Sequence, residues 1–143
     1  MNDCRVLLVD DEVDFVEVLA ERLGARGLAV KTATSGDEAL NAASDRSFDA
    51  IVLDMAMPGM DGLETLEKLL EINPDLQVIL LTGRATLEQA AMAIRIGALD
   101  LMEKPADLDT LVEKIELAAT RRWSLEEKRI EERVADIMRK KGW

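Results

Sequence analysis

The sequence predicts an α/β protein, a three-layer sandwich in which a parallel sheet is covered by helices on both faces. The first observation is that short apolar runs alternate with longer amphipathic stretches, five times along 143 residues. The second is that several of these runs are apolar at every position, which is typical of parallel strands buried between helices. Such (βα)5 alternation implies right-handed crossovers in a doubly wound sheet. Five units are too few for a closed eight-stranded barrel.

The expected strands are five apolar runs, at residues 6–9, 28–30, 50–53, 78–81 and 99–102. The expected helices are the stretches with apolar residues at helical spacing, at residues 13–25, 37–45, 63–72, 86–96 and 107–121. Local signals support the ends of these expected helices. Ser35 is suited to cap the start of the second helix. Asn73-Pro74 and Gly97 stop the third and fourth helices.

Residues 123–143 lie outside this pattern and predict a sixth, appended helix. Ser124 followed by Glu127 is typical of a capping box at a helix start. A thin apolar stripe follows, made of Ile130, Val134, Ile137 and Met138. We therefore expect a domain of residues 1–121 and a helical extension of residues 122–143. The extension either packs on its own domain or serves as a dimerisation or docking element, and we expect the second, because the five-helix domain is already complete.

The composition excludes several classes of protein. The 18 basic and 29 acidic residues give a net charge of −11, which argues against direct nucleic-acid binding by this chain. The absence of histidine excludes histidine bases and imidazole zinc sites, so a bound metal should have oxygen ligands, as Mg²⁺ or Ca²⁺ does. Cys4 is the one cysteine, so no internal disulfide forms. We expect a cytoplasmic protein with no signal peptide and no membrane span.

Polar side chains follow most of the expected strands, and the carboxyl ends of parallel strands are where open α/β sheets form their sites. The residues at these ends are Asp10, Asp11, Glu12, Asp54, Thr82, Lys104 and Pro105. Crowded carboxylates repel one another, and a divalent cation removes that penalty. Oxygen ligands on short loops suit Mg²⁺.

A carboxylate beside Mg²⁺, facing an ammonium and a hydroxyl group, is the arrangement that a phosphoryl acceptor needs. The metal and Lys104 would spread the charge that develops on the transferring group. Thr82 can donate a hydrogen bond to the same anion. An aspartate oxygen would act as the nucleophile.

Four motifs resemble the receiver domain of two-component response regulators. They are Val9-Asp10-Asp11-Glu12, the stretch from Leu53 to Gly62, Leu81-Thr82-Gly83, and Glu103-Lys104-Pro105. Each motif alone is weak, but all four occur in order and each follows an expected strand. The resemblance covers about residues 4–120 and implies the flavodoxin-like strand order 2-1-3-4-5.

The resemblance also implies a role for each residue of the site. Asp54 would accept a phosphoryl group from a histidine kinase or a histidine phosphotransfer protein, with no other enzymatic activity. Asp11, Asp54 and the main-chain carbonyl of Ala56 would bind Mg²⁺, and Asp10 would act mainly through water. Thr82 and Lys104 would contact the phosphoryl group, and the bond between Lys104 and Pro105 would be cis.

Two positions depart from the family pattern. Leu101 stands where the family carries the switch aromatic that is coupled to the threonine, and Ala106 replaces a second common aromatic. We therefore expect a different output surface and do not identify its target.

Alternatives to a stand-alone receiver make different demands on the sequence. The chain is either a stand-alone receiver or the front of a longer transcriptional or enzymatic regulator. A phosphorylation-independent pseudo-receiver would lack Asp54, Lys104 or the acidic pair, and all are present. A phosphatase of the aspartyl-phosphate type needs a second aspartate where Ala56 stands.

Overall fold

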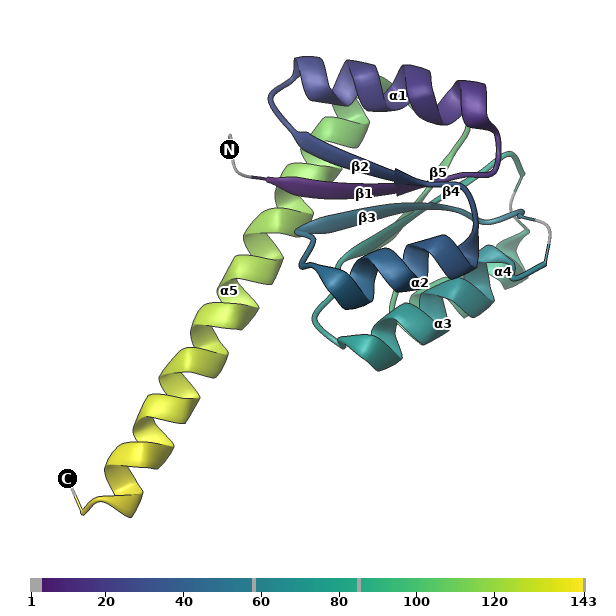
Figure 1. Cartoon of the computed structure of the whole chain (residues 1–143). Coiled ribbons are helices and arrows are strands. Elements are labelled where there is room, and N and C mark those ends of the chain that lie inside the picture. The colour runs from purple at the N-terminus through teal and green to yellow at the C-terminus, as the bar shows by residue number, and fades with distance from the viewer. Residues whose placement is uncertain (1–3, 58, 85, 143) are drawn as a thin grey trace.

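The computed structural model describes residues 4–57, 59–84 and 86–142 of the chain. A five-stranded parallel sheet in the order β2-β1-β3-β4-β5 forms its centre, and helices cover both faces (Figure 1). The strands are β1 (Arg5–Val9), β2 (Ala29–Ala33), β3 (Ala50–Asp54), β4 (Val78–Thr82) and β5 (Asp100–Glu103). The helices are α1 (Val13–Ala25), α2 (Gly36–Asp45), α3 (Gly62–Ile72), α4 (Leu87–Ile96) and α5 (Leu108–Lys140). The predicted three-layer fold and its strand order are confirmed.

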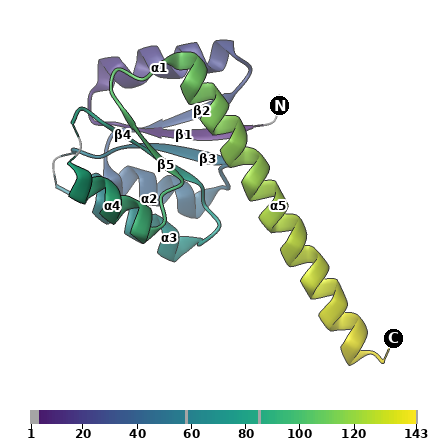
Figure 2. The same cartoon turned by 180° about the vertical axis from the view of Figure 1, so that it is seen from behind.

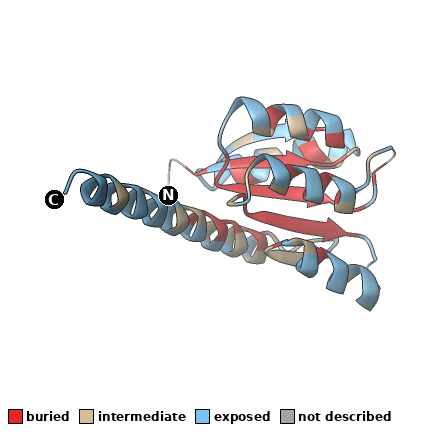
Figure 3. Cartoon of the chain, turned by 90° about the horizontal axis from the view of Figure 1, so that it is seen from below, coloured by how far each residue is buried: buried red, intermediate tan, exposed pale blue. Residues whose placement is uncertain are grey.

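Each face of the sheet buries its own apolar cluster, because successive side chains of a strand point to opposite faces. Leu7 and Leu53 belong to the cluster under α2, α3 and α4. Leu8 and Val52 belong to the cluster under α1 and α5. Both faces of β3 and β4 are buried along their whole length, which explains why these segments are apolar at almost every position (Figure 3).

The helix starts follow from local hydrogen bonds. Ser35 accepts a hydrogen bond from the main chain of Glu38, as predicted for a cap. Asp61 and Asp107 cap α3 and α5 in the same way, and Thr86 begins α4 with a full capping box. Such caps satisfy main-chain donors that a helix leaves free in its first turn.

The parallel register brings the ends of four strands to one edge of the sheet. Val9 pairs with Leu53, Asp54 with Leu81, and Thr82 with Glu103. The residues that follow these positions therefore emerge side by side, and the loops at this edge carry the candidate site.

The C-terminal extension is helical, as predicted, but it is not a separate sixth helix. The helix α5 runs without a break for 33 residues, and Ser124 and Glu127 lie inside it, so the prediction of a helix start there is wrong. Residues 117–127 contain neither glycine nor proline, and most of them favour helix, so nothing interrupts α5. Its C-terminal half projects away from the sheet (Figures 1 and 2).

No helix in the described part of the chain combines the length and the apolar character that a membrane-spanning helix needs.

Candidate functional site

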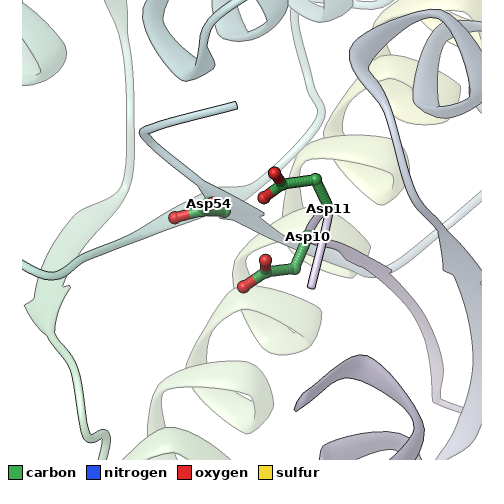
Figure 4. A group of neighbouring side chains, drawn as sticks. All are labelled: Asp10, Asp11 and Asp54. Carbon is green, nitrogen blue, oxygen red and sulfur yellow. The ribbon is translucent and has the colours of Figure 1, made fainter. Parts of the chain in front are cut away.

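Three aspartates converge at the carboxyl edge of the sheet. Asp10 and Asp11 follow β1, and Asp54 ends β3 (Figure 4). One carboxylate oxygen of each lies within 4.8 Å of those of the other two. Asp10 and Asp54 are buried, with 1% and 4% of their surface exposed, whereas Asp11 is more accessible. The strand order places β1 and β3 side by side, which is why residues 44 positions apart meet here.

Lys104 supplies the positive charge of the site from the end of β5. Its Nζ atom donates a hydrogen bond to Asp10 at 2.6 Å and lies 3.4 Å from an oxygen of Asp54. The ammonium also lies 4.6 Å from the centre of the Phe15 ring, a favourable cation–π contact. One lysine therefore holds two buried carboxylates on neighbouring strands.

The environment shifts the pKa values of this group. Burial raises the pKa of Asp54, and the charge of Asp10 adds to the effect, although Lys104 and the main-chain N–H of Ala56 oppose it. Burial alone would lower the pKa of Lys104, but its contacts with Asp10 and Asp54 outweigh that effect and raise it. The lysine therefore stays charged. The burial of two neighbouring carboxylates, Asp10 and Asp54, still disfavours the folded state.

Thr82 lies at the end of β4, next to the end of β5. Its side chain is buried, and its hydroxyl oxygen accepts a hydrogen bond from the main-chain N–H of Arg84 at 3.2 Å. The main-chain N–H of Lys104 donates to the carbonyl of Thr82 at 2.7 Å. This ladder contact sets Thr82 and Lys104 on adjacent strands at the same edge.

The remaining predicted residues lie around this edge. Ala56 is exposed in the loop after β3, two residues beyond Asp54. The Lys104–Pro105 bond is cis. Leu101 is partly buried against the apolar cluster under α2, α3 and α4, and it pairs with Leu80 in the sheet. Leu101 therefore contributes to the core and carries no polar group that could reach the site.

Two parts of the site were not predicted from the sequence. Phe15 lies on α1 and supports the lysine ammonium, but an aromatic residue in an amphipathic helix gives no local sign of such a role. Gly62 begins α3 so close to the site loop that a β-carbon there would lie 2.5 Å from the Cα atom of Met55. The glycine at the end of the stretch from Leu53 to Gly62 could have indicated this close approach to Met55, because glycine has no β-carbon.

The three aspartates form a suitable site for a divalent cation. All the donors are oxygen atoms, which hard cations prefer, and the cluster carries more negative charge than Lys104 neutralises. The residues therefore fit a metal site built from Asp10, Asp11 and Asp54.

The chain is similar to known proteins in both sequence and structure. Residues 6–116 match the family model of the response regulator receiver domain. The transcriptional regulatory protein ZraR of Escherichia coli O157:H7 is 36% identical over 113 residues, which are 79% of this chain and 26% of that protein. The C4-dicarboxylate transport transcriptional regulatory protein DctD of Rhizobium meliloti (strain 1021) is 36% identical over 131 residues, or 92% of this chain and 28% of that protein.

The fold is similar to solved receiver domains. A response regulator receiver domain protein from Clostridium thermocellum superposes with a TM-score of 0.81 at 31% identity, covering 85% of this chain and 98% of that one. The chain spans about a quarter of the length of the curated relatives that it matches. The match across most of the chain and the shared fold show that it belongs to the response regulator receiver domain family.

Proposed function

We propose that this protein is a phosphorylation-dependent receiver that accepts a phosphoryl group on Asp54. A histidine kinase or a histidine phosphotransfer protein would be the donor, since the chain has no histidine of its own. The observation that carries the proposal is the contact of 3.4 Å between Lys104 and Asp54, beside the carboxylates of Asp10 and Asp11. The acidic, disulfide-free composition suits the cytoplasm, where we place this reaction.

The geometry supports a direct transfer to the side chain of Asp54. One carboxylate oxygen would attack phosphorus as the phosphorus–nitrogen bond of a phosphohistidine breaks, and the imidazole would keep the electron pair. Lys104 lies close enough to neutralise negative charge on the transferred group. The Thr82 hydroxyl could then donate a hydrogen bond to a phosphoryl oxygen.

Mg²⁺ is the proposed cofactor, held by Asp10, Asp11, Asp54 and the main-chain carbonyl of Ala56. When bound, it would neutralise charge on the phosphoryl oxygens. Asp10 already holds Lys104 by a hydrogen bond, so its direct share in the metal site is expected to be small. Lys104 opposes the rise in the pKa of Asp54 that burial causes, and an ionised carboxylate is the form that can act as nucleophile.

The receiver could also be the front of a longer regulator. The observation that favours this second candidate is that the relatives named as transcriptional regulatory proteins are about four times as long as the matched segment. The chemistry at Asp54 is the same in both cases. Residues 1–121 would form the receiver, and the extension of residues 122–143 would connect it to a partner or to a further domain.

The proposal is tested by phosphorylation with a small donor. The protein is incubated with acetyl phosphate and Mg²⁺, and its intact mass is measured. We expect one added phosphoryl group in the parent and in Asp45→Asn, a matched change at an exposed aspartate of α2. We expect none in Asp54→Asn. If Asp54→Asn gains the group as readily as the parent, Asp54 is not the acceptor.

A further inference from the structure

Phe15 is an uncharged neighbour of the ammonium group of Lys104. The Nζ atom lies 4.6 Å from the centre of the Phe15 ring. The ammonium also has three carboxylate neighbours, those of Asp10 at 2.6 Å, Asp54 at 3.4 Å and the exposed Glu12 at 3.8 Å. Only 17% of the lysine side chain is exposed. The ammonium is therefore held both by acidic groups and by a ring whose attraction needs no carboxylate.

The segment from β1 into α1 places the ring next to Asp10. One oxygen of Asp10 accepts a hydrogen bond from Lys104, and the other accepts one from the main-chain N–H of Glu12 at 3.0 Å. The helix α1 begins at the next residue, and Phe15 lies in its first turn. The ring is partly buried against the apolar cluster under α1 and α5. One short segment therefore supplies both the hydrogen bond and the ring that hold Lys104.

We propose that Phe15 is a positioning residue for phosphoryl transfer, which acts by holding the ammonium of Lys104 beside Asp54. The inference rests on the proposed function, because it concerns the rate of transfer to Asp54. Lysine has a flexible four-carbon stem, and its charge assists the transfer only where negative charge develops. The ring restricts the stem and keeps water from part of the ammonium, which strengthens the attraction between the lysine and the transferred group.

The contact with the ring persists while the other contacts of the lysine change. Transfer adds charge at Asp54, and a bound cation would neutralise part of the charge of Asp10 and Asp54. The phenyl ring has no ionisable group, so its attraction for the ammonium is the same in each of these states. Such attraction extends to about 6 Å from the ring centre, so a contact of 4.6 Å survives a short movement of Lys104 toward Asp54.

The loop after Lys104 offers no second aromatic support. Pro105 and Ala106 follow the lysine, and neither carries an aromatic ring. A cavity of about 170 Å³ lies beside Phe15, and Ala106 and Leu108 form part of its wall. Since no bulky side chain from this loop fills that space, removal of the Phe15 ring leaves the lysine stem without an aromatic neighbour.

The first test is the rate at which acetyl phosphate phosphorylates the full chain at saturating Mg²⁺, followed by intact mass. Phe15→Leu keeps an apolar side chain but removes the ring, and the rate should fall about three- to tenfold. Phe15→Tyr keeps the ring and should stay within about twofold of the parent. Equal rates in the parent and in Phe15→Leu overturn the positioning role.

A matched control separates positioning from packing. Leu19 lies one turn along α1, packs against the same apolar cluster and lines the same cavity. Leu19→Ala should lower the melting temperature at least as much as Phe15→Leu does, because it also removes packing, yet it should leave the phosphorylation rate unchanged. If Leu19→Ala slows phosphorylation as much as Phe15→Leu, packing alone explains the effect and the proposal is wrong.

The second test reports the lysine directly and needs no phosphoryl donor. The protein is labelled with ¹³C-lysine, and the Lys104 signal is assigned by its loss in Lys104→Gln. The ring current of Phe15 should shift the ε-methylene protons of Lys104 upfield in the parent and in Phe15→Tyr, but not in Phe15→Leu. An unshifted signal in the parent overturns the proposal.

The two experiments distinguish this role from the proposed function. If Asp54 of the parent takes no phosphoryl group, the proposed function fails, and the role of Phe15 in the transfer fails with it. If Asp54 is phosphorylated at the same rate in Phe15→Leu, only the role of Phe15 is removed.

Discussion

Lys104 donates its short hydrogen bond of 2.6 Å to Asp10, and its contact with Asp54, the proposed acceptor, is the longer one at 3.4 Å. The lysine is thus held mainly by a residue that comes 94 positions earlier in the chain. In this state Asp54 is left with a carboxylate that is only partly neutralised. We expect Lys104 to move toward Asp54 when that residue carries a phosphoryl group, because the added charge strengthens its attraction.

Replacement of Lys104 by methionine should destabilise the fold. The change leaves Asp10 and Asp54 buried without their cation, and loss of one partner from a buried pair costs about 3 kcal/mol. Urea unfolding in the absence of divalent cations measures this free energy. Lys68→Met removes a lysine from an exposed pair and should change it by less than about 0.5 kcal/mol. Equal losses in the two variants would contradict the role given to Lys104.

Mg²⁺ should raise the melting temperature of the parent protein. The clustered carboxylates repel one another, and a ligand that binds only the folded state adds about 2.7 kcal/mol at a hundred times its dissociation constant. Thermal unfolding with and without Mg²⁺ measures the shift. Asp11→Ala should reduce it strongly, whereas Asp14→Ala, in the first turn of α1, should keep it. A full shift in Asp11→Ala would place the ion elsewhere.

The contact between Arg129 and Asp75 should stabilise the protein in a pH-dependent way. The hydrogen bond from Arg129 holds the pKa of Asp75 below its ordinary value. The contact therefore adds to the free energy of unfolding at pH values above the pKa of Asp75 in the unfolded chain, about 3.9. This contribution is lost as the pH falls through the lower pKa of Asp75 in the folded protein. The unfolding free energy of the parent should exceed that of Arg129→Met at neutral pH, and the difference should vanish in acid.

A matched control separates this contact from a general effect of charge. Arg121 lies on the same helix and forms no ion pair with any residue that the structure describes. Arg121→Met should therefore show no such pH dependence. A difference between the parent and Arg129→Met that persists in acid would mean that packing of the arginine, rather than its charge, supplies the stability.

Cys4 should be inert toward thiol reagents in the folded protein. It is fully buried, and burial, with the charges of Asp49 and Glu116, raises its pKa to about 11. Only about one thiol in a thousand is then ionised at pH 8, and the thiolate is the reactive form. A thiol reagent should label the native protein very slowly and should label one thiol per chain in urea. Fast labelling of the native protein would show that β1 opens readily.

The alternation of strands and helices in the sequence was sufficient to determine the fold class. Period and length separate buried parallel strands from amphipathic helices, and both features are local. The residues of the site could be predicted together for a related reason. Asp10, Asp54, Thr82 and Lys104 each follow or end an apolar run, and parallel strands bring such positions to one edge of the sheet.

Only the tertiary structure decided how these residues and the last helix are used. Phe15 lies under Lys104, and Asp49 and Asp75 hold the end of α5, through contacts between residues far apart in the chain. The pattern at Ser124 predicted a helix start, yet the same residues continue a helix whose preceding turns are packed on the sheet. A capping pattern indicates only that a helix could start at that position. Burial of Leu111 and Ile115 and the two anchoring carboxylates decide that α5 continues, because these contacts stabilise a helix already formed on both sides of Ser124.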